Sequence, residues 1–218
     1  KRRKSPCHRA SGSGKTERAT CAYRWSKTIT GYDRPSATSS ERCSNGDSTL
    51  AFYNGKLLPP KGYRACGLSC GIKDDGIKDM ALIVSERPAS AAGVYTTNLV
   101  QAAPVQLNRE HLSDGSAQAI LVNSGNANAC TGEQGLADAR RMCAVTAEAL
   151  ELEPSDVLVC STGVIGVGLP MEAIVDGIPQ VAATLSRDGG LDAAEAMMTT
   201  DTVAKQCAVE VDVNGTTV

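Results

Sequence analysis

The chain has 218 residues, of which 42% are hydrophobic and only 3% aromatic, so one or two domains with an aliphatic core are expected. No apolar run approaches the roughly 18 residues of a membrane span, and an odd count of nine cysteines without a CxxC pair argues against a complete disulfide framework. The net charge of −2 conceals an asymmetry: residues 1–50 carry 11 Lys or Arg and 4 Asp or Glu, whereas residues 51–218 carry 11 and 20.

The basic segment has the composition of a disordered arm, rich in Arg, Lys and Ser and poor in apolar residues. The same composition fits an organelle transit segment. SGSGKT (Ser11 to Thr16) imitates a phosphate loop, but the position of the first glycine of that motif is Arg9. Residues 1–56 are therefore predicted to be an arm and residues 57–218 the folded domain.

Four strands are predicted in the first part of the folded domain, from apolar runs bounded by turn residues. They comprise residues 78–85, 91–98, 103–108 and 117–123, the first two separated by a turn around Pro88. The last of these strands leads into a Gly- and Asn-rich loop, NSGNANACTG (Asn123 to Gly132).

A helix is predicted next, because Thr131 and Gln134 have the spacing of a capping box. Its apolar face repeats at helical spacing through Leu136, Ala139, Cys143, Ala147 and Leu150. The remaining predicted elements are a strand at 156–160, a helix from Pro170 to about Leu185, a short helix at 191–199 and a strand at 207–213. Asn214-Gly215 then predicts a hairpin whose return strand would have only three residues, so the chain is expected to be a truncated part of a longer protein.

Side chains that commonly carry catalysis or metals are few. His111 is expected to be a surface-loop residue, and the acidic group Asp74, Asp75 and Asp79 a solvated turn without calcium-loop spacing. Cys66 and Cys70 lack the second Cys or His pair of a zinc site. No metal and no cofactor are therefore expected.

Two loops at the carboxyl ends of strands remain, NSGNANACTG and STGVIG (Ser161 to Gly166). Gly163 permits a close approach of the backbone, and exposed N–H groups beside a hydroxyl suit an oxyanion or a phosphate. On these residues alone, an ordinary strand-to-helix turn is the simpler explanation.

Six segments in the same order change this interpretation: PKGYRACGLSCGIK, KDMALIVS, AAGVYTTN, NSGNANACTG, STGVIG and MMTTDT. With them, residues 57–218 resemble the amino-terminal part of the ornithine acetyltransferases, the bifunctional glutamate N-acetyltransferases of arginine biosynthesis. Residues 1–50 match nothing in that family. The resemblance implies a layered α/β sandwich of mixed sheets with outer helices, not a Rossmann fold.

The resemblance also implies a mechanism and partners. Family members cut themselves before a threonine into an α and a β chain, which commonly assemble as a heterotetramer of two α and two β chains. The new amino-terminal threonine takes the acetyl group of N-acetylornithine and passes it to glutamate, and some members also use acetyl-CoA. A cytoplasmic location is expected, or a mitochondrial or plastid one if residues 1–50 are a transit segment.

For the site, the resemblance implies that Thr162 and Gly163 form the oxyanion hole and that Thr199 contacts substrate, with Thr200 and Thr202 as alternatives. The nucleophilic threonine is not in this chain, because Thr216 and Thr217 lie in the hairpin that precedes the cleavage segment. The 218-residue chain alone is therefore expected to be inactive.

Two alternatives stay open. A related self-cleaving hydrolase of the aminopeptidase type has the same architecture, although NSGNANACTG and TTDT favour the acetyltransferase. A nucleic-acid-binding protein would use the basic arm of residues 1–50. The acidic folded part and the few aromatic residues of that arm disfavour this alternative, so no nucleic-acid or membrane partner is expected.

Overall fold

A computed structural model describes the backbone of residues 42–45, 48–53, 59–74, 76–206, 208–210, 212–213 and 216–217, and the side chains of residues 59–74 and 76–206. The chain divides into two units, residues 1–35 and residues 36–218. The first unit, with most of the predicted basic arm, lies outside the described residues, so every element below belongs to the second.

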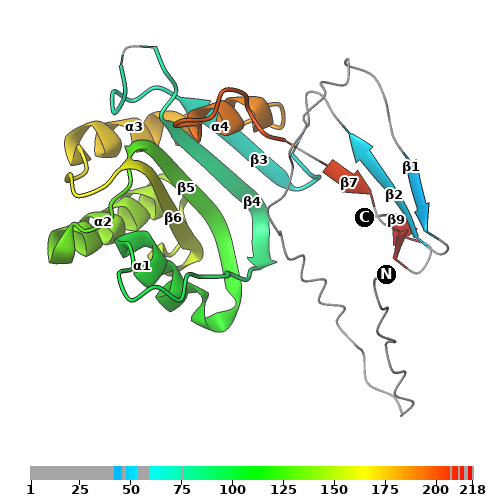
Figure 1. Cartoon of the computed structure of the whole chain (residues 1–218), viewed down its shortest axis with the longest axis horizontal. Helices are drawn as coiled ribbons and strands as arrows, with labels where there is room; N and C mark the ends of the chain where they lie inside the picture. The colour runs from blue at the N-terminus through cyan, green and yellow to red at the C-terminus, as the bar shows by residue number, and fades with distance from the viewer. Residues whose placement is uncertain are drawn as a thin grey trace, which may run out of the picture. The chain divides into compact units, whose positions relative to one another are not determined.

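A four-stranded mixed sheet forms the centre of the fold (Figure 1). Its order is β3 (Tyr63–Leu68), β4 (Met80–Ser90), β5 (Ser116–Asn126) and β6 (Val157–Val164). Neighbouring strands run antiparallel from β3 to β5, whereas β5 and β6 are parallel. A parallel pair needs a crossover connection, which here contains the longest helix described.

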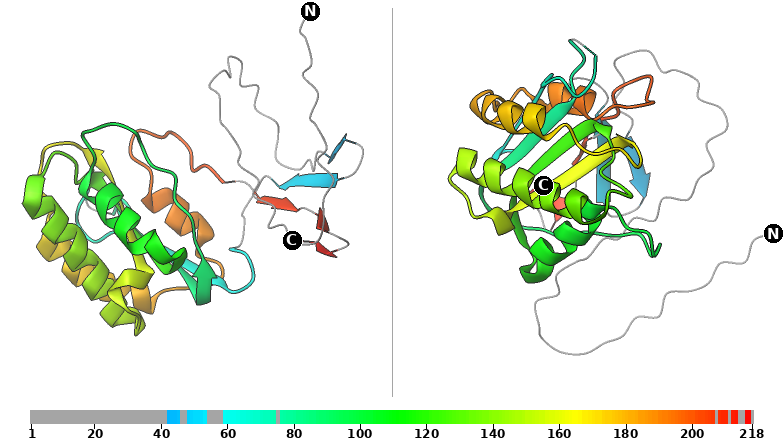
Figure 2. Two further views of the ribbon diagram at one scale, coloured as in Figure 1. Left: turned by 90° about the horizontal axis from the view of Figure 1, so that it is seen from below. Right: turned by 90° about the vertical axis from the view of Figure 1, so that its left-hand side faces the viewer.

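Helices cover both faces of this sheet. On one face lie α1 (Ala103–His111), α2 (Gly132–Leu150) and α3 (Met171–Ala183), which Figure 2 shows as a layer in front of the strands. The short helix α4 (Gly190–Ala196) packs on the opposite face, against β3 and β4. Short 3₁₀ turns, η1 (Leu112–Asp114) and η2 (Pro154–Asp156), precede β5 and β6. None of the helices within the described ranges has the length and apolarity that crossing a membrane requires.

The main core lies between the sheet and the three-helix layer and is aliphatic, as the composition predicted. Its largest fully buried apolar side chains are Met80, Leu82, Leu107, Leu121, Met142, Val157, Val159, Ile174, Ile178 and Val181. Each such side chain contributes about 1.5–3 kcal/mol through burial. A smaller cluster on the other face joins α4 to the sheet through Ala65, Ala81, Val122, Ala193 and Ala196.

The predictions for β5, β6, α2, α3 and α4 are confirmed within a few residues at each end. The capping box of α2 is wrong: the Thr131 side chain makes no cap hydrogen bond but donates to Asn128 Oδ1 (2.7 Å). Gln134 donates instead to Asp138 Oδ1 (2.8 Å), one helical turn along.

Two strand predictions are wrong. Residues 103–108 begin helix α1, and residues 91–98 form no strand. The turn predicted around Pro88 is wrong as well, because β4 continues through it, with a register shift between Val84 and Ala89. Proline is tolerated within a strand at such an irregularity, where the ladder does not need its missing N–H.

Strand β3 was not predicted, and neither were β1 (Arg42–Asn45) and β2 (Ser48–Tyr53), which fall in the segment expected to be disordered. The two antiparallel strands β1 and β2 form a sheet with β7 (Ala208–Glu210). The predicted hairpin is confirmed in the antiparallel pairing of β8 (Asp212–Val213) with β9 (Thr216–Thr217).

Candidate functional site

The two loops that the sequence singled out meet at one edge of the main sheet. In the parallel register of β5 and β6, Ser124 lies opposite Thr162 and Gly125 opposite Gly163. The carboxyl ends of neighbouring parallel strands open onto the same edge, which is where ligands bind in many α/β sheets. NSGNANACTG and STGVIG therefore form a single site.

Glycine is required at both positions, at Gly163 by the contact with the other loop and at Gly125 by the neighbouring Ile72. Gly163 has φ +133°, and a Cβ there would lie 2.2 Å from the carbonyl oxygen of Gly125. Gly125 has φ +123°, and its Cβ would lie 2.6 Å from Ile72 Cγ2. No other residue adopts these dihedrals without strain, so the two backbones touch directly.

Hydrogen bonds between main-chain groups fix this contact beyond the strands. The N–H of Ala127 donates to the carbonyl of Val164 (2.8 Å), and the N–H of Gly166 donates to the carbonyl of Ala129 (2.9 Å). Each loop thus satisfies polar groups of the other, and the two are held as one unit.

Two buried asparagines hold the NSGNANACTG loop through side-chain hydrogen bonds. Asn123 and Asn128 are both fully buried. Asn123 Nδ2 donates to the Asn126 carbonyl (3.0 Å), and Asn128 Nδ2 donates to the Gly135 carbonyl (2.9 Å) on α2. Asn128 has φ +46°, a left-handed conformation that asparagine tolerates better than most residues.

Thr162 points to the α4 side of the sheet. Val159 faces the three-helix layer, and alternation along β6 turns Thr162 to the other face. Its side chain is partly exposed, and Gly163 beyond it is exposed. The hydroxyl and the backbone of this pair are therefore accessible to a ligand on that side.

Thr199, Thr200 and Thr202 follow α4, and all three are exposed. The register partner of Thr162, Ser124, donates its hydroxyl to the carbonyl of Ala196 (2.5 Å), at the end of α4. The segment that carries the three threonines thus starts from the face of the sheet on which Thr162 lies.

The prediction of a solvated turn is wrong for Asp79, whereas Asp74 is exposed as predicted and Asp75 lies outside the described residues. Asp79 is fully buried and accepts backbone N–H groups from Cys70 (2.7 Å), Ile72 (2.7 Å) and Lys73 (3.0 Å). A buried carboxylate is tolerated when such bonds satisfy it, so Asp79 holds the loop between β3 and β4 in place. The sequence signal was its position directly before a buried strand.

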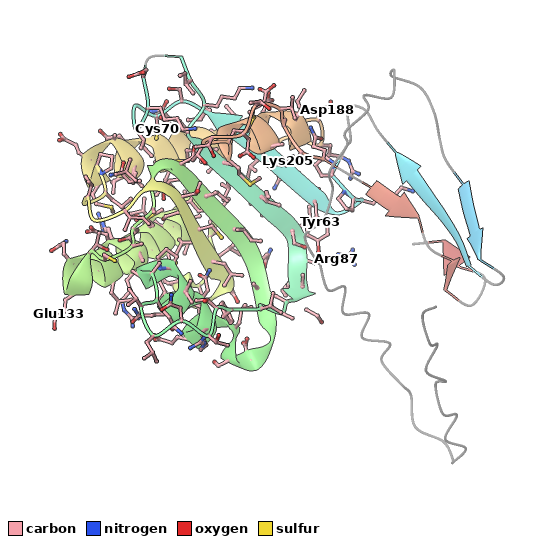
Figure 3. The ribbon with its side chains drawn as sticks, viewed as in Figure 1. Tyr63, Cys70, Arg87, Glu133, Asp188 and Lys205 are labelled. Atoms are coloured by element: carbon pink, nitrogen blue, oxygen red, sulfur yellow. The ribbon has the colours of Figure 1, made fainter. Side chains whose placement is uncertain are left out.

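Two groups with catalytic potential serve structural roles. Burial and the nearby Asp79 carboxylate raise the pKa of Cys70 to about 12, which leaves this thiol inert; Figure 3 labels it beside α3. His111 ends α1 rather than lying in a loop, and its Nδ1 lies 2.8 Å from the carbonyl of Val157. Across the residues that the structure describes, no group of three His, Cys, Asp or Glu side chains is placed to hold a metal ion.

The fold places this chain in the class of α/β sandwich proteins. Within that class, its distinguishing feature is the backbone contact between two glycine-containing loops at a parallel strand pair. A sequence profile described as the ArgJ family matches residues 64–218, so the chain belongs to the ArgJ family.

Similar proteins include the arginine biosynthesis bifunctional protein ArgJ of Caldanaerobacter subterraneus, 55% identical over 166 residues, which are 76% of this chain and 41% of that protein. The protein of the same name from Symbiobacterium thermophilum is 54% identical over 171 residues, 78% of this chain and 42% of that protein. The chain thus spans about two fifths of the length of these relatives.

Two solved structures have the same fold. The crystal structure of the arginine biosynthesis bifunctional protein argJ from Bacillus halodurans superposes with a TM-score of 0.73 at 44% identity, covering 79% of this chain and 91% of that chain. Ornithine acetyltransferase from Mycobacterium tuberculosis in complex with ornithine gives 0.71 at 42% identity, covering 74% and 88%. These matches confirm the predicted α/β sandwich with a mixed sheet.

Proposed function

We propose that this chain is the amino-terminal, α-chain part of an acetyltransferase that moves the acetyl group of N-acetylornithine to glutamate in arginine biosynthesis. Membership in the ArgJ family carries the proposal. The proposal is supported by a relative of 42% identity, an ornithine acetyltransferase whose crystal structure contains ornithine.

In the proposed reaction, a threonine hydroxyl attacks the acetyl carbonyl carbon of N-acetylornithine, and the carbonyl oxygen becomes an oxyanion. Collapse of this intermediate breaks the bond to the ornithine nitrogen, which leaves as an amine after protonation, and an acetyl-threonine ester remains. The amino group of glutamate then attacks the ester, and a second oxyanion forms before N-acetylglutamate leaves. Both oxyanions need hydrogen-bond donors held in advance.

Thr162 and Gly163 are the proposed donors, through the threonine hydroxyl and the glycine N–H. The proposal is supported by their position at the carboxyl end of β6 and by the glycine-only contact with Gly125, which fixes the backbone of this loop. A donor that does not move during the reaction costs no reorganisation and therefore contributes most.

The nucleophilic threonine is proposed to lie in a β chain from the same precursor, in an assembly of two α and two β chains. The comparison with longer relatives supports this, because the chain spans about two fifths of their length. Thr199 is the proposed substrate contact within this chain.

The test uses the product of the complete gene, assayed for acetyl transfer from N-acetylornithine to glutamate. Thr162→Ala should lower kcat by roughly 10²–10³-fold with little change in KM, the loss typical of an oxyanion-hole donor. Thr162→Ser keeps the hydroxyl and is the matched control, expected to retain most activity.

Three related measurements also test the proposal. Peptide hydrolysis without acetyl transfer would favour the aminopeptidase-type alternative and refute the acetyltransferase. Acetylation of glutamate by acetyl-CoA would add a second donor. Acetyl transfer by the 218-residue chain alone would contradict the proposal that the nucleophile lies elsewhere.

A further inference from the structure

The last carbonyl of α4 and one carbonyl of the segment that follows it each accept a hydrogen bond from a side chain of another element. The last carbonyls of a helix have no partner within it. Here Ser124 on β5 donates to the carbonyl of Ala196 (2.5 Å), and Lys73 donates through Nζ to the carbonyl of Met198 (2.6 Å). The residue directly after Met198 is Thr199.

Lys73 is itself fixed at both ends. Its backbone N–H donates to the buried carboxylate of Asp79 (3.0 Å), and its Nζ also donates to the carbonyl of Lys78 (3.1 Å). Its side chain is partly buried, and this desolvation lowers the pKa of Lys73 while the Asp79 charge opposes the shift. The ammonium group is thus a donor presented from a rigid loop.

Ser124 connects the same segment to the candidate oxyanion loop. It is fully buried, it lies opposite Thr162 in the parallel register, and its N–H donates to the carbonyl of Asp79 (2.8 Å). Both anchors therefore converge on Asp79, which joins the loop between β3 and β4 to β5.

We propose that Lys73 and Ser124 are positioning residues that hold the Met197–Thr202 segment, and with it Thr199, beside the Thr162–Gly163 loop. The inference rests on the proposed function in taking Thr199 as the substrate contact. Neither residue needs to touch substrate: Lys73 acts through the carbonyl of Met198 within the segment, and Ser124 acts through the carbonyl of Ala196, directly before it.

Four variants of the complete gene product test this proposal. Lys73→Met removes the donor but keeps an apolar stem of similar length, and Lys73→Arg restores a cationic donor. Ser124→Ala removes the second anchor. Arg141→Met is the matched control, because it removes an exposed cation from α2, on the opposite face of the sheet.

Amide hydrogen exchange at Met197 and Met198, whose N–H groups donate to the carbonyls of Ala193 and Glu195, gives a readout that does not depend on activity. Lys73→Met should accelerate exchange there about tenfold, since bonds to charged donors are among the stronger ones, and leave α2 unchanged. The KM for N-acetylornithine should rise about tenfold with kcat within about threefold. Lys73→Arg should recover most of both effects.

Exchange and KM equal to those of Arg141→Met would overturn the proposal, as would faster exchange throughout α2, which indicates a general structural role. If Lys73→Met does not fold, Ser124→Ala decides, and unchanged exchange at Met197 and Met198 then refutes the proposal. A wild-type protein without acetyl transfer would instead refute the proposed function, while the exchange measurement would still test the anchoring.

Discussion

Replacing Gly163 with alanine tests the backbone contact on which the candidate site is built. The new Cβ would lie 2.2 Å from the Gly125 carbonyl oxygen and 2.3 Å from its carbon. Neither atom is the end of a flexible side chain, so two paired strands would have to separate. Gly166→Ala, three residues along, is the matched control, because it also has positive φ (+80°) but no atom within 4 Å of the added methyl group.

The expected costs differ because the control carries backbone strain alone. Strain at a left-handed position costs an alanine about 1 kcal/mol relative to glycine, the whole expected effect at Gly166. At Gly163 the strain is about 1–3 kcal/mol, and overpacking adds about the same, for a sum near 4 kcal/mol. At about 2–4 °C per kcal/mol for a folding unit of 150–250 residues, the Tm of the unit that contains these loops should fall by about 8–16 °C for Gly163→Ala and by about 2–4 °C for Gly166→Ala.

Thermal unfolding and acetyl transfer by the complete gene product measure both consequences. Displacing a catalytic group by about 1 Å costs on the order of 10²-fold in rate, so Gly163→Ala should lose at least that much kcat. Gly166→Ala should stay within about threefold of wild type, because its methyl group meets no neighbour. Equal Tm values for the two variants, or Gly163→Ala with more than a third of wild-type activity, would refute the reasoning from contact geometry.

Two further predictions concern Asp79 and the cysteines. Asp79→Asn should accelerate amide exchange at residues 70–73 by about 30-fold, because the best orientation of the new amide leaves the Cys70 N–H without an acceptor. The control Asp74→Asn, at an exposed position, should change this exchange less than about twofold. Unchanged exchange in Asp79→Asn would contradict the role of the carboxylate. Burial raises the pKa of Cys143 to about 12, so its reactive thiolate stays rare at pH 8 and becomes common only above that pKa. Alkylation at pH 8, detected by mass spectrometry, should modify exposed Cys130 well before Cys143. The reverse order would contradict the burial of Cys143.

The sequence predicted best the elements with a sustained apolar pattern. Residues 119–122 (AILV) are apolar because β5 has the three-helix layer on one face and α4 near the other, and α2 and α3 show helical periodicity. The strand prediction for residues 103–108 was wrong because apolar and polar residues alternate in VQLN, as they do in a strand. The buried positions Ala103, Pro104 and Leu107 have the helical spacing i, i+1 and i+4, and Pro104 suits the first turn of a helix.

The candidate site could be predicted in part from the sequence. Glycines at positions 125 and 163 marked two loops, but their contact depends on the strand register, which no local pattern encodes. Asp79 and Lys73 were missed for the same reason. A carboxylate in an Asp- and Gly-rich stretch resembles a solvated turn until the fold buries it, and the partner of Lys73 lies 125 residues away.

Helix α4 touches the sheet at main-chain distance. A Cβ on Gly67 would lie 2.0 Å from the Asp192 carbonyl oxygen, and one on Gly189 would lie 1.9 Å from that of Ala65. At these two points no side chain separates the start of α4 from β3, and the rest of the contact is made mainly by small alanine side chains, so the helix has little room to slide on the sheet. The segment after α4 is therefore expected to keep its position when the proposed substrate binds, and crystals of the complete gene product with and without N-acetylornithine should superpose at α4.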